Sequence, residues 1–147
     1  MKCIDDYEEF RLIYDSYDLK FIFECLKKLI VNEDENMNEF YNTNKGLLIP
    51  VMDKFREALP KVNKVEKMLS SSECNNYCFE ECIFYYAKIM IDLTYEEAIT
   101  LLFYLKIKKF KEQCNIIRKN KLVKELEGYI GRHKAWLDFR KITVDNV

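Results

Sequence analysis

The chain has 147 residues, 49% of them hydrophobic and 33% charged, which excludes a disordered polypeptide and is typical of one globular domain spanning residues 1–147. Three Gly and two Pro are too few for the turns of a sandwich or barrel, so helix is expected to dominate. The net charge of −1 is unevenly spread: residues 1–40 hold eleven acids and five bases, and residues 106–124 hold eight bases and one acid. We interpret these as an acidic opening and a solvated helix face, with binding of nucleic acid or an acidic partner less favoured.

Residues 19–31 form the first candidate element, and their pattern has two interpretations. Leu19, Ile22, Phe23, Leu26 and Ile30 fit the 3.6-residue period of a helix. The same residues also read as a strand "LKFIF", a turn and a strand "LIV". Short apolar runs do not separate these interpretations, so both stay open.

The next segment is predicted to contain a loop and then a helix. The stretch "ENMNEFYNTNKG" is Asn-rich and typical of a loop. The stretch "GLLIPVMDKFREAL" reads as a helix beginning at about Ile49, because Pro50 is tolerated only in a first turn, and ending at Pro60. After it, "KVNKVEKML" is either a strand or a short helix.

Three successive helices are predicted in the second half, at residues 79–90, 95–105 and 107–118. Each has an apolar face at helical spacing. Thr94 and Glu97 form a capping-box pattern at the start of the middle helix. The three faces are Phe79, Cys82, Ile83, Tyr86 and Met90; Ala98, Leu101, Leu102 and Leu105; and Ile107, Phe110, Cys114 and Ile117. We expect Phe79, Ile83, Leu101, Leu102 and Phe110 to form one core.

A weaker helical pattern follows, in which Leu122, Leu126, Tyr129 and Ile130 share a face. It forms a C-terminal helical extension at about residues 121–147. The final "KITVDNV" reads as an extended or frayed tail.

The cysteines raise the question of a metal or redox site. Cys74, Cys78 and Cys82 stand four apart, but a structural zinc site usually pairs its ligands as C-x2-C or H-x3-H. His133 is the only histidine, and the three glycines are too scattered for a phosphate-binding loop. We therefore expect no metal, no cofactor, no catalytic residues and no enzyme activity.

The sequence lacks signals for membranes or secretion. No run of about 18 apolar residues is present, and "MKCIDDYEEF" is too acidic for a signal peptide. An intracellular protein, cytoplasmic or nuclear and not bound to a membrane, is expected, with its six cysteines as free thiols.

Residues 79–114 resemble the C-terminal half of BTB/POZ domains. The matching residues are Phe79, Tyr85, Asp92, Leu93, Glu97, Ala98, Leu101, Leu102, Phe110, Lys111 and Cys114. Residues 8–24 match more loosely, because Asp18, Leu19, Phe21 and Phe23 fit the family's first strand. The resemblance implies an α+β fold over about residues 8–119, with a small sheet flanked by a mainly helical cluster. The alternative is an all-α helical bundle.

The resemblance implies a non-catalytic protein–protein interaction domain, a scaffold or a substrate adaptor of a cullin-type ubiquitin ligase. The partners that the resemblance suggests are a second copy of this chain, in a homodimer, and a cullin. Since "FYY" at residues 84–86 cannot face wholly inward on one helix, we predict a partner-binding surface there. Its residues are Glu80, Glu81, Phe84, Tyr85 and Lys88.

Two other functions stay open. One is an all-helical regulator, of viral or parasite origin, that binds a partner protein in a groove. The more distant one is nucleic-acid binding through residues 106–124. Residues 19–31 separate the first two hypotheses, because a strand pair supports a BTB domain and a continuous helix contradicts it.

Overall fold

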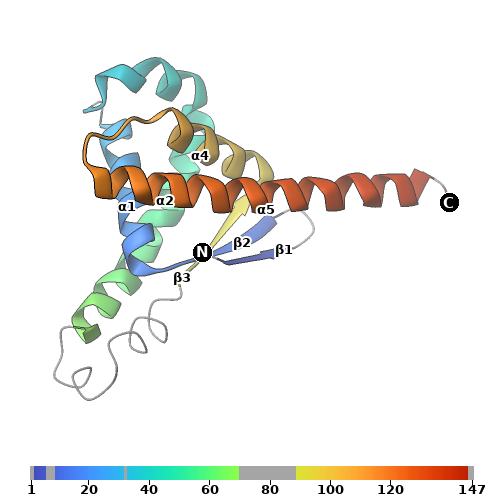
Figure 1. Ribbon diagram of the computed structural model, residues 1–147, viewed down its shortest axis with the longest axis horizontal. Helices are drawn as coiled ribbons and strands as arrows, with labels where there is room; N and C mark the ends of the chain where they lie inside the picture. The colour runs from blue at the N-terminus through green and yellow to red at the C-terminus, as the bar shows by residue number, and fades with distance from the viewer. Residues whose placement is uncertain (1, 6–8, 32, 70–88, 146–147) are drawn as a thin grey trace.

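The computed structural model describes residues 2–5, 9–31, 33–69 and 89–145 (Figure 1). Their elements are, in chain order, β1 (Lys2–Asp5), β2 (Glu9–Tyr14), α1 (Ser16–Ile30), a 3-10 turn η1 (Glu35–Met37), α2 (Asn38–Leu69), β3 (Ile89–Thr94), α4 (Tyr95–Ile107) and α5 (Gln113–Asp145). This combination of helices with a small antiparallel sheet confirms the expected α+β class, and the all-α alternative is wrong.

The three described strands form one antiparallel sheet with β2 in the middle. Leu12 stands opposite Ile91, and both are buried on the face that packs against the helices. On the other face, Arg11 stands opposite Asp92 and binds it through two hydrogen bonds of 2.7 and 3.1 Å. This alternation of buried and exposed residues is the period-2 pattern of a half-buried strand.

Helix α1 is continuous from Ser16 to Ile30, so the strand-pair interpretation of residues 19–31 is wrong. The Asp15 carboxylate accepts a hydrogen bond of 2.7 Å from the Asp18 backbone N–H and caps the first turn. Leu19, Ile22 and Leu26 are then buried at helical spacing. The first strand that the BTB/POZ resemblance requires at Asp18, Leu19, Phe21 and Phe23 is therefore a helix here.

The extent of helix α2 shows that three predictions for residues 35–69 are wrong. The Asn-rich stretch is helical, the helix begins at Asn38 rather than Ile49, and it continues past Pro60 to Leu69. Both prolines stand inside the helix, where each lacks an N–H and costs about 3 kcal/mol. Figure 1 shows that the beginning of α2, at the top of the view, and its end, at the lower left, run in different directions, as prolines inside a helix favour.

Packing explains why α2 persists through its prolines. Its core-facing residues are fully or almost fully buried: Leu48, Val51, Met52, Phe55 and Ala58. Each buried large side chain contributes about 1.5–3 kcal/mol, enough together to outweigh two missing backbone hydrogen bonds. The helical interpretation of "KVNKVEKML" is confirmed, since these residues complete α2.

Strand β3 replaces the end of the first predicted helix of the second half. Ile89 and Met90 begin this strand, so the helix predicted at residues 79–90 is wrong at these two positions. Residues 79–88, with Phe79 and Ile83, lie outside the described residues. Ile89, Ile91 and Leu93 alternate with more exposed neighbours and pair with β2.

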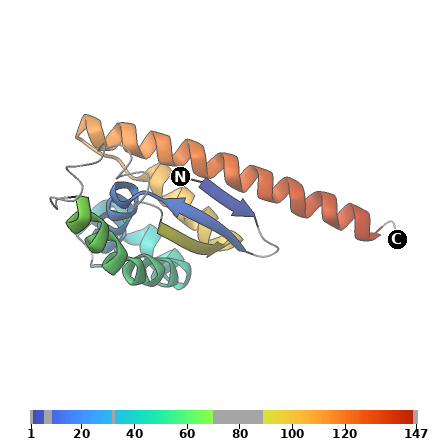
Figure 2. The same ribbon diagram turned by 90° about the horizontal axis from the view of Figure 1, so that it is seen from below.

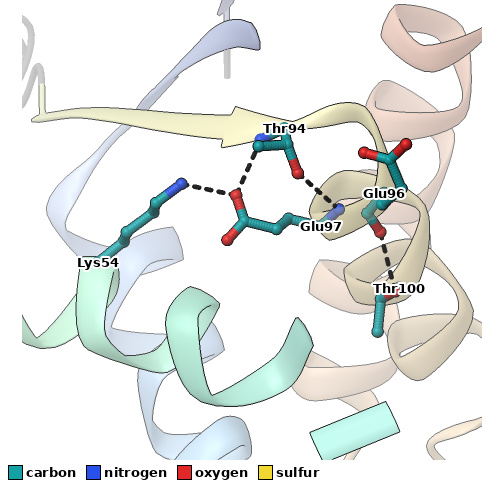
Figure 3. A network of polar contacts seen from close by, with 5 residues as sticks. All are labelled: Lys54, Thr94, Glu96, Glu97 and Thr100. Atoms are coloured by element: carbon teal, nitrogen blue, oxygen red, sulfur yellow. Dashed lines mark hydrogen bonds and ion pairs between the residues drawn. The ribbon is translucent and has the colours of Figure 1, made fainter. Parts of the chain in front are cut away.

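Helix α4 confirms the helix predicted at residues 95–105 and extends to Ile107. Figure 3 shows the cap at its start, where the Glu97 N–H donates to the Thr94 hydroxyl at 3.2 Å and the Thr94 N–H donates to the Glu97 carboxylate at 2.9 Å. Thr94 is therefore the predicted N-cap, in a complete capping box.

Replacing Thr94 with alanine is expected to lower the free energy of unfolding by about 1 kcal/mol, because the Glu97 N–H loses its acceptor. Chemical denaturation followed by circular dichroism measures the change. Thr94→Ser keeps the hydroxyl and should keep most of the stability. Equal losses in both variants would assign the effect to the Thr94 methyl group instead of the cap.

The helix predicted at residues 107–118 is wrong at residues 108–112, which connect α4 to α5. Ile107 and Ile117 are 46% and 60% exposed, so the apolar face predicted from them does not exist. Phe110 does pack against the core, as does Leu102, while Leu101 is fully buried. The expected core is thus confirmed for the three of its five residues that the structure describes.

Helix α5 runs from Gln113 to Asp145, so the tail predicted as extended is helical up to that residue. Leu122, Leu126 and Ile130 are buried on one face, with Tyr129 half-buried beside them, as predicted. Figure 2 shows α5 passing the sheet on the side of β1 and continuing beyond the rest of the molecule.

Candidate partner-binding groove

The face of α1 that turns away from α2 forms one wall of an open groove of about 540 Å³. Residues 108–112 and the first turns of α5 form the other wall (Figure 1, left of the view). The α1 wall consists of Tyr17, Lys20, Phe21, Glu24, Cys25 and Lys28, which follow helical spacing. The opposite wall consists of Lys108, Lys109, Phe110, Lys111, Glu112, Asn115 and Arg118.

Two aromatic rings join the walls. The ring centroids of Phe21 and Phe110 lie 5.3 Å apart, within the range of favourable aromatic pairs. The Arg118 guanidinium lies 5.7 Å from the Phe21 ring, and the Lys108 ammonium lies 5.8 Å from the Phe110 ring. Both contacts have cation–π geometry. Because both rings are only partly buried, the groove offers apolar surface between cationic groups.

The groove is strongly cationic. Among the described residues, six cationic side chains and two carboxylates line it, a formal charge of +4, although the whole chain carries −1. Four of the six cations belong to the basic stretch of residues 106–124. Two of them also contact acids of the first forty residues: Lys108 pairs with Asp34, and the Arg118 guanidinium lies 3.9 Å from the Asp18 carboxylate.

The rest of the basic stretch is held partly by internal contacts. Lys106 forms an ion pair of 2.6 Å with Glu127. Lys119 donates to the backbone carbonyl of Lys106 at 3.0 Å and to that of Lys108, so it satisfies carbonyls at the end of α4. Burial, with a smaller effect of Lys109, lowers the pKa of Lys119. The acidic opening and the basic stretch meet through the contacts of Lys108 with Asp34 and of Arg118 with Asp18.

Asp18 is the most buried carboxylate in this contact between α1 and α5. Burial and the neighbouring Asp15 raise its pKa, while Lys121 and Arg118 oppose the shift. The folded state thus binds the Asp18 proton more tightly than the unfolded state does. Its contribution to stability is present below the ordinary pKa of 3.8 and is lost as the pH rises through the raised pKa.

Replacing Asp18 with asparagine is therefore expected to raise the free energy of unfolding most at neutral pH, where the wild-type carboxylate is charged and desolvated. The gain should shrink as the pH falls toward 3.8. Urea denaturation at several pH values measures it, with Asp53→Asn as the control for loss of an exposed carboxylate. A variant less stable than the wild type at pH 7 would mean that the ion pairs with Arg118 and Lys121 outweigh desolvation.

Cys25 lies on the α1 wall of the groove and is buried. Burial raises the pKa of its thiol to about 11, although Lys108 and Lys28 oppose the shift. The thiol is therefore protonated at neutral pH, and a protonated thiol is a weak nucleophile. The backbone carbonyl of Cys25 accepts a hydrogen bond of 3.0 Å from the buried Tyr104 hydroxyl, which ties α1 to α4.

Among the described residues, the others considered for chemistry are His133 and Cys114, neither of which belongs to the groove lining. His133 is fully buried on α5, with its ring centroid 5.8 Å from that of Tyr95. Cys114 is exposed, and both Cys114 and Cys25 are free thiols. Cys74, Cys78 and Cys82 lie outside the described residues. In the part of the chain that the structure describes, no three His, Cys, Asp or Glu side chains gather where they could hold a metal ion.

The predicted partner-binding residues Glu80, Glu81, Phe84, Tyr85 and Lys88 all lie outside the described residues, so their surface stays a prediction. The groove was not predicted from the sequence, although one of its walls has a periodic pattern. Tyr17, Lys20, Phe21, Glu24 and Lys28 stand at i, i+3, i+4, i+7 and i+11, a polar-aromatic face on the side of α1 away from its apolar face. The other wall comes from a connection between helices and has no such period.

Comparisons with protein-family models, curated proteins and solved structures found no match for this chain. Among the described helices, none is both long and apolar enough to cross a bilayer.

Proposed function

We propose that this protein is a non-catalytic interaction module that binds a segment of a partner protein in the groove between α1 and residues 108–112. The observation that carries the proposal is the pair of partly exposed rings, Phe21 and Phe110, set among six cationic side chains. Aromatic side chains and arginine are enriched in protein–protein interfaces, and the groove carries Phe21, Phe110 and Arg118. The protonated thiol of Cys25 supports binding rather than nucleophilic chemistry.

The narrower hypothesis of a cullin adaptor rests only on the BTB/POZ resemblance. Helix α1 stands where that resemblance requires a strand, and β3 begins where it requires the end of a helix. The matched residues of α4 do lie in a helix, whereas Phe110 and Lys111, which the resemblance also puts in a helix, lie in the connection between α4 and α5. The proposed binding site therefore uses the groove and does not depend on membership of that family.

The test is an affinity purification from the native host with three forms of the protein. The wild type is compared with a groove variant, Lys109→Glu with Lys111→Glu, and with a control variant, Lys61→Glu with Lys64→Glu. The control makes the same charge change at exposed positions of α2 outside the groove lining.

We expect the groove variant to lose partner proteins that both the wild type and the control retain, because it reverses two charges on one wall of the groove. Thermal unfolding establishes that all three forms are folded. Equal recovery of the same partners by all three forms would reject the groove as the binding site.

A further inference from the structure

The arrangement of charged side chains in the groove indicates the chemistry of the ligand that it binds. Lys20 and Lys28 stand on the α1 wall, and Lys109 and Lys111 stand on the opposite wall, all four exposed. The Phe21 and Phe110 rings join the two walls. A ligand in this groove therefore meets cations on both sides and an apolar surface beneath it.

We propose that the occupant is a short acidic segment of a partner protein that carries at least one apolar or aromatic side chain between its carboxylates. This inference rests on the function proposed above and specifies the chemistry of the partner. The carboxylates would pair with lysines of the two walls, and the apolar side chain would pack on the Phe21 and Phe110 rings. The formal charge of +4 in the lining supplies the charge complementarity.

The size of the groove favours a short segment over a folded surface. Its volume of about 540 Å³ lies in the range of sites that take a small ligand or a few side chains. A stable interface between two folded proteins buries roughly 800 Å² on each partner and needs a broader surface. Short segments that insert one anchor between charged contacts suit a groove of this kind.

Arg118 adds a geometric reason for a carboxylate ligand. Its guanidinium lies near the Phe21 ring, on the groove lining, and its side chain is 41% exposed. Its distance of 3.9 Å from Asp18 exceeds that of a hydrogen bond, so the contact is a long ion pair. A guanidinium binds a carboxylate best through two parallel hydrogen bonds, which a ligand carboxylate can supply.

Nucleic acid fits the groove less well. Glu24 and Glu112 belong to the lining and would repel phosphates. Binding of a polyphosphate backbone needs a continuous cationic track, whereas a peptide with spaced carboxylates tolerates two acids among the lysines.

The experiment measures fluorescence anisotropy with a labelled peptide of sequence Glu-Asp-Phe-Glu-Asp-Leu-Glu-Asp and the full chain. Three other ligands are compared: the same peptide with Lys at each acidic position, the same peptide with Ser at both apolar positions, and an oligouridylate of similar length. We expect the acidic-apolar peptide to bind more tightly than each of these by at least about tenfold.

Protein variants then test whether the peptide binds in the groove. Lys109→Glu with Lys111→Glu should weaken binding by at least about tenfold, and Lys61→Glu with Lys64→Glu should leave it almost unchanged. Phe110→Ala should also weaken binding, and the loss should persist at high salt, which screens charges but not ring contacts. Because the lysine variants change only exposed side chains, they test the site even if Phe110→Ala proves unstable.

Each alternative result overturns the inference. If the groove and control lysine variants lose equal affinity for the acidic peptide, the peptide is attracted by the net charge of the protein and not by a specific site. Tighter binding of oligouridylate would identify a nucleic-acid groove. If the peptides fail to bind while the groove variant still loses its native partners, the acidic segment is wrong and the proposed function stands. If neither peptide binding nor the recovery of native partners depends on the groove residues, both proposals are wrong.

Discussion

Replacing Phe55 with alanine is expected to lower the free energy of unfolding by about 3–5 kcal/mol, the largest effect that we predict for this protein. The Phe55 side chain is fully buried in α2, and its ring centroid lies 5.6 Å from that of Tyr14 in β2. The substitution removes the ring, leaves a cavity and breaks an aromatic contact between the sheet and the helix.

The position of Phe55 in α2 adds to this expectation. It stands five residues after Pro50 and five residues before Pro60. Each proline weakens the helix by about 3 kcal/mol, so this segment depends on tertiary packing more than an ordinary helix does. Losing the central packing residue should therefore also reduce the helical content of α2.

Urea denaturation and far-ultraviolet circular dichroism measure both effects. Phe103→Ala is the matched control, because Phe103 is a phenylalanine that is 55% exposed on α4. It should change stability by less than about 0.5 kcal/mol. A loss below 1 kcal/mol for Phe55→Ala would mean that the core can collapse around the cavity, and that α2 does not depend on this contact.

The parts of the fold that the sequence predicts well are those specified by neighbouring residues. The start of α4 is the clearest example, because Thr94 and Glu97 carry the whole capping box within four residues. The apolar spacing of Leu122, Leu126 and Ile130 likewise predicts the buried face of α5. In both cases the residues that decide the structure lie within one or two helical turns.

The errors occur where distant residues decide the structure. Proline rules predict breaks in α2, but burial of Leu48 and Phe55 outweighs them. Met90 continues the helical period of the preceding residues, yet Ile89 and Met90 pair with Tyr14 and Ile13 of β2, far away in the sequence. The groove has the same origin, because Phe21 and Phe110 meet only when the chain folds.

The second large effect concerns Lys54 and Glu97, which form an ion pair of 2.6 Å between α2 and α4 (Figure 3). The Glu97 side chain is only 6% exposed, whereas that of Lys54 is 33% exposed. Removing the ammonium leaves a buried carboxylate without its cation, while removing the carboxylate leaves a lysine that can reach water. The two partners should therefore respond unequally to substitution.

We expect Lys54→Met to lower the free energy of unfolding by about 2–3 kcal/mol, because methionine keeps much of the side-chain volume but leaves the Glu97 carboxylate unpaired. Glu97→Gln should cost only about 1 kcal/mol. Its amide oxygen can still accept from the Thr94 N–H, and Lys54 can turn toward solvent. Urea denaturation of both single variants measures the difference.

The double variant Lys54→Met with Glu97→Gln isolates the interaction between the two side chains. Because glutamine carries no charge, the methionine no longer leaves a buried carboxylate without a cation. The double variant should then be more stable than the sum of the two single losses predicts, by about 1–2 kcal/mol. Strictly additive losses would place this contact among ordinary surface ion pairs, which contribute little. In that case the contacts between α2 and α4 would depend on their buried apolar residues, Phe55 and Leu101 among them.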